Sequence, residues 1–357
     1  MKLISKIILI IVSCLILIGI TIITAYNINI GAVDKKNKNT INFEVTENST
    51  YSNLGDELYK AGLIKSKTFY KIYVKLNKPS NLQKGIYALN KSMSLKEIIN
   101  SLGKGSTYNP YIVSITIKEG YNIRKIASII DEKTDNSYDD VMNKITDKKY
   151  INTLINKYWF LSTDITNADI YYPLEGYLFP ETYQISSKNT VEEIFEILLN
   201  QMDKILTKYK TDIQNSSYTI NQIVTLASII ELEAGNANDR AGVAGVFYNR
   251  IKGNWSLGSD VTTYYANKID DFKHSLTKTE LNSCNNKYNT RCSTYKGLPV
   301  GPISNPSEES LKAAINPTSH NYYYFVADGS GKTYLNTNST GHNNTITKLK
   351  KENNWCA

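Results

Sequence analysis

The hydrophobic pattern of the chain begins with a long uncharged stretch, residues 7–26, which follows Lys2 and Lys6. About 20 helical residues rise 30 Å, the thickness of the hydrocarbon core of a bilayer. A cleaved signal peptide would have a shorter apolar region and a small-residue cleavage site. The length of the stretch and the lack of a clear cleavage site favour an uncleaved transmembrane helix, within residues 1–26. The two lysines favour a cytoplasmic N-terminus, although further lysines follow the stretch.

The pattern after this stretch predicts a polar linker over residues 27–42 and then a small α/β unit. Residues 41–64 change from a strand pattern to a helix pattern, and residues 65–76 continue as a second helix. Residues 82–89 alternate as a return strand, and a third helix over 93–105 ends at a glycine. We therefore expect a separate unit over residues 43–110.

Residues 111–357 are expected to form a larger domain of mixed α+β class. Its first segment, residues 112–133, repeats the plan of a strand, an acidic turn and an amphipathic helix. Such small units suit a binding module, and they equally suit plain α/β scaffolding. Both interpretations stay open at this point.

The most informative helix pattern lies at residues 219–235, where a broad apolar side ends in the sequence ELEAG. Glu231 and Glu233 are two positions apart, which places them about 200° apart around a regular helix. Both carboxylates therefore cannot face one scissile bond. We expect one to do chemistry and the other to have a structural or orienting role. A glutamate in an apolar setting suits a general acid, because desolvation raises its pKa. A solvated helix end is the alternative interpretation.

The segments after this helix are rich in short polar, aromatic, glycine and proline residues, and residues 322–343 predict a hairpin. Such loops suit sugar recognition better than phosphate binding. The chain has no P-loop, no G-x-G-x-x-G and no G-x-S-x-G motif.

Composition changes this picture little. The net charge is 41 − 33 = +8, without a basic run or a motif that would indicate nucleic-acid binding. The four cysteines have no metal-binding spacing, and no cofactor is expected. Cys284 and Cys292 flank a polar loop and would be able to pair in an exported protein. Their pairing is left open by the sequence.

Several segments together resemble the endolytic murein transglycosylase family, also described as YceG-like. The resemblance extends over most of the chain after the apolar stretch, and the ordered set is more specific than any one member. Its markers are LEGYLFPETY at 174–183, LASIIELEAG at 226–235, VAGVFYNRI at 243–251, LGSDVTTYYA at 257–266, YNT at 288–290, GLPVGPISNP at 297–306, SLKAAINP at 310–317, YYYFVADGSG at 322–331, and HN at 342–343.

The resemblance implies a single-pass membrane protein with a LysM-like unit near the membrane and an extracytoplasmic catalytic domain. Members of the family cut nascent peptidoglycan strands internally, between N-acetylmuramic acid and N-acetylglucosamine, and leave a 1,6-anhydro end. No cofactor or metal is implied, and peptidoglycan synthases are the protein partners it suggests.

The family's catalytic glutamate falls on Glu233 of this chain. Other family positions give candidate substrate-binding residues, namely Glu231, Asp260, Thr262, Tyr264, Asn289 and His342. The chain departs from the family pattern at Leu232, where the family often has a basic residue, and at Val261 and Val300, where it often has proline.

Two other functions are weighed against this one. A hydrolytic muramidase would need a second carboxylate, such as Asp260, to activate water. A non-catalytic wall-binding protein would hold glycan strands and release no fragments.

Overall fold

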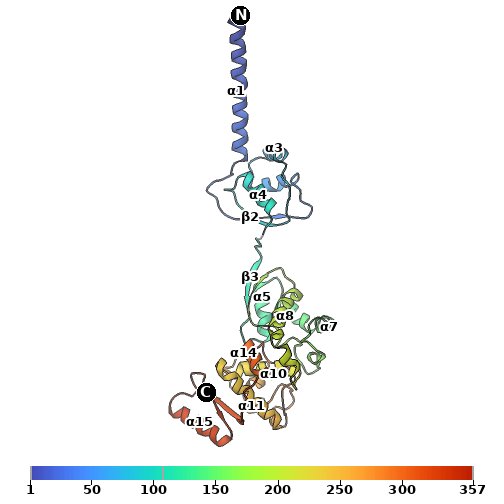
Figure 1. Cartoon of the computed structure of the whole chain (residues 1–357), viewed down its shortest axis with the longest axis vertical. Coiled ribbons are helices and arrows are strands. Elements are labelled where there is room, and N and C mark those ends of the chain that lie inside the picture. Colours follow the sequence, from blue (N-terminus) through green and yellow to red (C-terminus); the bar gives the residue numbers. More distant parts are fainter. Residues whose placement is uncertain (1, 107, 356–357) are drawn as a thin grey trace. The chain divides into compact units, whose positions relative to one another are not determined.

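The computed structural model describes residues 2–106 and 108–355 of the chain, which divide into two compact units at Ile112 and Val113 (Figure 1). Both units mix helices with short two-stranded sheets, so the α+β class expected from the sequence is confirmed. Each unit has its own hydrophobic core.

The first unit begins with α1, Lys2–Ile30, which extends beyond the predicted end at Tyr26 into the predicted linker. Its segment Lys6–Ile30 has a mean hydropathy of 3.1 and is exposed over most of its length, while Tyr26 and Ile30 pack against the core of the unit. A helix of this length and composition is able to cross a bilayer, and a signal sequence has the same features. The helix is therefore consistent with membrane association.

The rest of the first unit packs three helices against one antiparallel strand pair. Phe43 of one strand lies opposite Tyr87 of the other, and both side chains are buried. Helix α4 begins at a capping box formed by Ser94 and Glu97 and is capped at Gly105, as predicted. The elements are β1 (Ile41–Val45), α2 (Leu54–Lys60), α3 (Lys67–Asn77), β2 (Gly85–Leu89) and α4 (Leu95–Lys104).

The second unit is mainly helical. Its elements are β3 (Ile112–Thr116), α5 (Ile123–Lys133), α6 (Tyr138–Thr146), α7 (Lys148–Lys157), the 3₁₀ turn η1 (Thr163–Thr166), β4 (Thr182–Ser186), α8 (Val191–Thr207), α9 (Lys210–Gln214), α10 (Ile220–Glu233), the 3₁₀ turn η2 (Ala237–Asp239), α11 (Arg240–Lys252), α12 (Asp260–Ala266), α13 (Lys278–Asn282), α14 (Glu308–Ile315), β5 (Tyr324–Ala327), β6 (Thr333–Asn336) and α15 (Ser339–Lys351).

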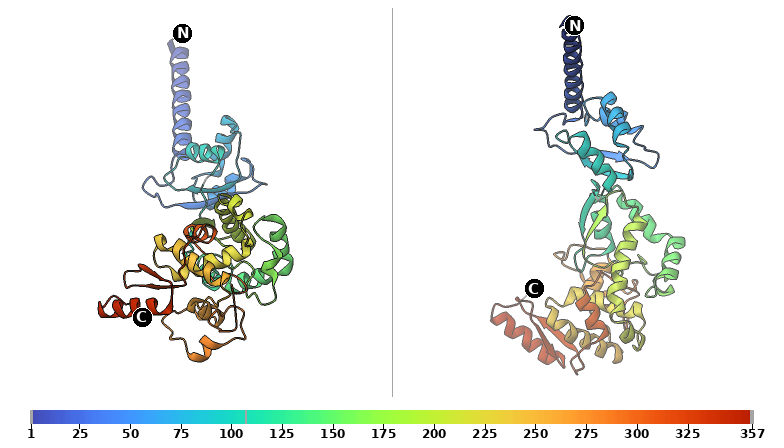
Figure 2. Two further views of the ribbon diagram at one scale, coloured as in Figure 1. Left: turned by 60° about the horizontal axis from the view of Figure 1, so that its bottom comes forward. Right: turned by 45° about the horizontal axis from the view of Figure 1, so that its top comes forward.

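Helix α10 is the centre of this unit, and α11, α12 and α14 pack against it (Figure 2). Strand β3 pairs with β4, and the predicted C-terminal hairpin is present as antiparallel β5 and β6, with α15 beside it. A disulfide joins Cys284 to Cys292, which settles the question that the sequence left open. The loop that it closes lies directly after α13.

Candidate active site

Helix α10 carries the two glutamates at its C-terminal end. A capping box of Thr219 and Gln222 begins the helix. Its middle residues, from Ile223 to Ile230, are all buried, so the helix is held on every side. It ends at Glu233, two residues before the glycine at which the sequence predicted its end. The last three residues of the helix, 231–233, are partly exposed. Their backbone continues the buried part of the helix, which holds it in place.

Glu231 lies in a buried ion pair. Its Oε1 atom accepts a 2.9 Å bond from Arg240, and its Oε2 atom accepts from the backbone N–H of Ser307 at 2.8 Å. The side chains of Arg240 and Glu231 are only 10% and 5% exposed. Because Arg240 begins α11 and Ser307 caps α14, this carboxylate ties together three helix ends.

Glu233 points to a different set of residues, as its helical spacing from Glu231 predicts. The hydroxyl of Ser259 donates a 2.6 Å hydrogen bond to its Oε1 atom. Burial of the carboxyl raises the pKa of Glu233 most strongly, and the charge of Asp260 raises it further. The bond from Ser259 and the charge of Arg250 act in the opposite direction without cancelling the rise. A carboxyl with a raised pKa keeps its proton nearer to neutral pH and suits a general acid.

Asp260 presents a second carboxylate beside Glu233. It is the first residue of α12, and its Oδ1 atom lies 3.2 Å from Nε of Arg291. Arg291 also donates to the carbonyl of Gly258 at 3.3 Å. The Asp260 side chain is 57% exposed, so water or a ligand can reach it.

An aromatic cluster contacts Arg250, whose Nε donates to the carbonyl of Tyr323 at 2.7 Å. The indole ring of Trp255 is 5.0 Å from the ring of Tyr323 and 6.0 Å from that of Tyr324, and Trp255 is 42% exposed. His342 lies 5.5 Å from Tyr324, and burial lowers the pKa of its imidazole, helped by the charge of Arg250. We call Trp255, Tyr323 and Tyr324 the aromatic platform.

Three of the predicted substrate-binding residues bond to the protein itself. Thr262 is fully buried and donates to the carbonyl of Ser259 at 2.6 Å. Asn289 is 1% exposed, and its amide donates to three carbonyls of residues 280–283. The hydroxyl of Tyr264 donates to the carbonyls of Phe272 and His274, at 3.3 and 2.5 Å. These bonds fix the start of α12 and the segments at 272–274 and 280–283.

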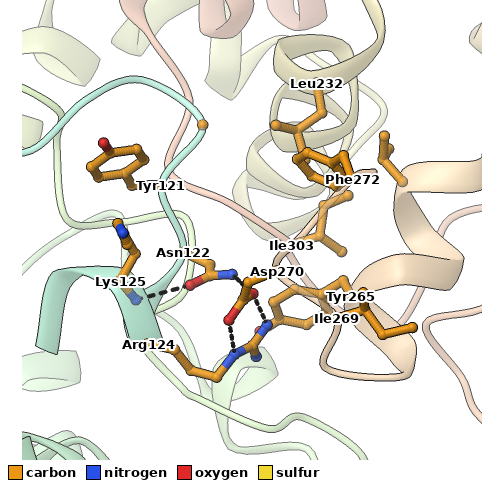
Figure 3. Close-up of a pocket in the computed structure, with 12 residues that line it drawn as sticks. Tyr121, Asn122, Arg124, Lys125, Leu232, Tyr265, Ile269, Asp270, Phe272 and Ile303 are labelled. Carbon is orange, nitrogen blue, oxygen red and sulfur yellow. Dashed lines mark hydrogen bonds and ion pairs between the residues drawn. The ribbon is translucent and has the colours of Figure 1, made fainter. Parts of the chain in front are cut away.

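A pocket of about 300 Å³ lies next to the end of α10. Tyr121 and Lys125 form one side of it, and Leu232, Phe272 and Ile303 lie opposite (Figure 3). Its remaining lining comes from Gly120, Asn122, Arg124, Val261, Tyr265, Ile269 and Asp270.

One wall of this pocket is braced by a buried carboxylate, Glu175. It accepts from the backbone N–H of Ile123 at 3.1 Å, from the hydroxyl of Tyr265 at 2.9 Å and from the amide of Asn305 at 3.2 Å. Burial raises the pKa of Glu175 to about 7. The bonds link the start of α5 to α12 and to the loop before α14.

Sequence reasoning missed Ser259 and the aromatic platform. Ser259 lies next to the predicted Asp260, and its position directly before a helix was the available signal. Trp255 and Tyr324 are separated by 69 positions, 324 − 255, so no local pattern joins them. Within residues 2–106 and 108–355, no three His, Cys, Asp or Glu side chains form a group that would hold a metal ion.

Comparisons with known proteins agree on one family. The model of the YceG-like family matches residues 43–348. The endolytic murein transglycosylase of Bacillus subtilis (strain 168) is 34% identical over 313 residues, which cover 87% of this chain and 85% of that protein. The protein of the same name from Streptococcus pneumoniae (strain D39) is 32% identical over 88% of this chain, which spans 59% of that longer protein.

A solved structure has the same fold. The crystal structure of a putative YceG-like protein from Listeria monocytogenes superposes with a TM-score of 0.60 at 31% identity, covering 86% of this chain and 99% of that chain.

Proposed function

Because this chain belongs to the YceG-like family, we propose that it is a membrane-anchored endolytic lytic transglycosylase with Glu233 as its acid and base. The single observation that carries the assignment to Glu233 is its environment. It is a half-buried carboxyl with a raised pKa, held by one short bond from Ser259 at the rigid end of a buried helix. Both carboxylate oxygens of Glu231 are already bonded, to Arg240 and to Ser307.

The proposed reaction needs one carboxyl. Protonated Glu233 gives its proton to the glycosidic oxygen as the bond from that oxygen to C1 of N-acetylmuramic acid breaks. The carboxylate then takes the proton of the C6 hydroxyl of the same sugar, and that oxygen bonds to C1. The products are a 1,6-anhydro end and a free N-acetylglucosamine hydroxyl, with no water consumed. Glycosidases that hydrolyse the bond usually need a pair of carboxylates.

The neighbouring charges suit this cycle. Arg250 and Arg291 both lower the pKa of Glu233, so they stabilise the carboxylate that forms when the proton leaves. The exposed aromatic platform offers ring faces on which a sugar can stack. Arg250 bonds to the carbonyl of Tyr323 in this platform, and its charge also acts on Glu233. We assign Thr262, Tyr264 and Asn289 to positioning the loops, because their polar groups are bonded within the protein. Asp260 and His342 remain candidates for contact with the strand.

The remaining parts receive proposals of the same kind. Helix α1 would anchor the chain, with a cytoplasmic N-terminus and residues 43–357 outside the membrane. The first unit would act as a LysM-like module within residues 43–110, ahead of a catalytic domain at 111–357. Work beside peptidoglycan synthases is suggested by the family resemblance, and a pull-down of the full chain would test it.

A hydrolytic muramidase is the second candidate, and Asp260 favours it. This carboxylate is exposed and its charge acts on Glu233, so it can serve as the base for an attacking water. Hydrolysis and transglycosylation differ by one water in their products.

The deciding experiment incubates the full chain in detergent micelles with un-crosslinked glycan strands and identifies the fragments by mass spectrometry. Fragments one water lighter than hydrolysis products, absent with Glu233→Gln, would support the proposal. Reducing, hydrated ends that require Asp260 would establish the muramidase. Binding of strands without fragments would instead support a wall-binding protein.

A further inference from the structure

We propose that the pocket beside Leu232 binds the stem peptide of the muramic acid at which the strand is cut. This inference rests on the proposed function, because only a glycan strand carries this branch past Glu233. It makes the peptide stem a determinant of substrate choice.

The pocket shares its walls with the elements that carry the reacting groups. Leu232 directly precedes Glu233 on α10, and successive helical residues point about 100° apart. Val261 likewise directly follows Asp260 on α12. Two residues that line the pocket are therefore direct sequence neighbours of Glu233 and Asp260. A branch on a sugar bound at Glu233 would therefore have this pocket on neighbouring residues of the same two helices.

The pocket contains two basic residues, Arg124 and Lys125, and only the first is in an ion pair. Arg124 is bonded to Asp270 twice, from Nε to Oδ2 at 3.0 Å and from Nη2 to Oδ1 at 2.5 Å. Asn122 adds a 2.6 Å bond to the same carboxylate. The charge of Arg124 is thus compensated. Lys125 forms no ion pair within the described part of the chain, although its charge helps to lower the pKa of Asp270. Its ammonium lies 5.9 Å from the centroid of the Tyr121 ring.

The lining matches the chemistry of the branch. The stem begins with a lactyl group and a small apolar residue, and it continues with a residue that bears a free carboxylate. Leu232, Phe272 and Ile303 offer an apolar wall for the first part (Figure 3). Lys125, on the opposite side, offers a cation to the carboxylate. A bare sugar would use the ring faces of the platform and would have no need of this cation.

The pocket is formed before any ligand arrives, because its wall at residues 120–123 is bonded on both sides. The backbone N–H of Gly120 donates to the carbonyl of Asn305 at 2.9 Å, and the N–H of Asn305 donates back to the carbonyl of Tyr121 at 2.9 Å. The N–H of Ile123 is held by buried Glu175. A preformed pocket loses little conformational freedom on binding, which favours its use for recognition.

The test compares two substrates with the full-length enzyme in detergent micelles. One is an un-crosslinked glycan strand with its stems, and the other is the same strand after an amidase has removed them. We expect wild-type kcat/KM to be about tenfold or more higher for the stem-bearing strand, the equivalent of one charge-assisted contact. Lys125→Glu should bring this ratio near one by slowing only the stem-bearing strand. Phe272→Ala, at a 55% exposed position, should reduce the ratio in the same way.

Lys133→Glu is the matched control, because Lys133 ends the same helix α5 and is absent from the pocket lining. It should leave the ratio unchanged. Equal wild-type rates on both strands would overturn the pocket proposal and leave the transglycosylase proposal standing. An equal loss of kcat/KM on both strands in Lys125→Glu would overturn the pocket proposal in the same way. Failure of wild-type enzyme to cut either strand would overturn both.

Discussion

The hydroxyl of Ser259 donates a 2.6 Å hydrogen bond to Oε1 of Glu233, across 26 positions of the chain. Ser259 is 3% exposed, and its own backbone is held by Thr262 and Thr290. Because the backbone of Ser259 is fixed in this way, its hydroxyl holds the carboxyl of Glu233 in one orientation. It also stabilises the charged form, which lowers the pKa of Glu233 from the value that burial alone would set.

Ser259→Ala should consequently change the pH profile as well as the rate. Without the bond, the pKa of Glu233 rises further, so the alkaline limb of kcat/KM should move to higher pH. The maximal rate should fall roughly tenfold, because a hydrogen bond to a charged group has been lost. Initial rates on glycan strands between pH 4 and 9 measure both effects. Thr263→Val is the control, since Thr263 bonds to Asn289 and not to Glu233. An unshifted limb in Ser259→Ala would contradict this role.

The two glutamates of α10 should separate chemistry from stability. Glu233→Gln should lower cleavage by ~10²–10⁴-fold or more, because it removes the acid and keeps the shape. Glu231→Gln should leave a smaller catalytic defect and lower the free energy of unfolding by about 3 kcal/mol, because it leaves the buried Arg240 without its ion-pair partner.

Fragment release and urea unfolding of both variants check these expectations. All three tryptophans, Trp159, Trp255 and Trp355, lie in the second unit, so their fluorescence follows the unfolding of that unit alone. Equal catalytic losses at the two glutamates, with unchanged stability, would refute the single-acid mechanism.

Trp255→Ala tests the aromatic platform. Removing a half-exposed ring that stacks on a sugar should raise KM for long strands about tenfold and leave kcat nearly unchanged. Trp159→Ala is a matched control, because Trp159 is 36% exposed and its indole N–H is bonded to Asp203 at 2.7 Å. The same rise in KM in both variants, or a loss confined to kcat, would show that the aromatic platform does not bind the strand.

Local periodicity was enough to predict several parts of the site. The helix that ends in ELEAG, and the divergence of Glu231 from Glu233, follow from 3.6 residues per turn. The C-terminal hairpin and the capped end of α4 follow from turn chemistry. These features depend on neighbours within a few positions.

The rest depends on contacts between distant segments. Three features join segments that lie tens of residues apart: the bond from Ser259 to Glu233, the pocket lined by Lys125 and Leu232, and the hydrogen bonds of Glu175. Thr262 and Asn289 illustrate the converse. The family resemblance made both candidates for substrate contact, and in the structure both side chains are buried and bond to the backbone of neighbouring loops. Buried polar groups need partners, and folded loops supply them.

Buried Glu175 should make the stability of the second unit depend on pH. Burial raises its pKa to about 7 in the folded chain, from an ordinary value of 4.5. A carboxyl with a raised folded-state pKa contributes stability that is complete below the unfolded pKa and is lost as pH rises through the folded pKa. The free energy of unfolding should therefore fall between pH 4.5 and 8, by as much as about 3 kcal/mol from this group.

Glu175→Gln should flatten this dependence, because an amide does not titrate and its oxygen can still accept from Ile123 and Tyr265. Urea unfolding of the full chain, followed by tryptophan fluorescence at several pH values, measures it. Glu181→Gln is the control, since this carboxylate lies in the same motif and is exposed. A slope that persists in Glu175→Gln would mean that another group titrates. A slope equally reduced by Glu181→Gln would mean that the surface charge of the motif, and not the buried brace, sets the dependence.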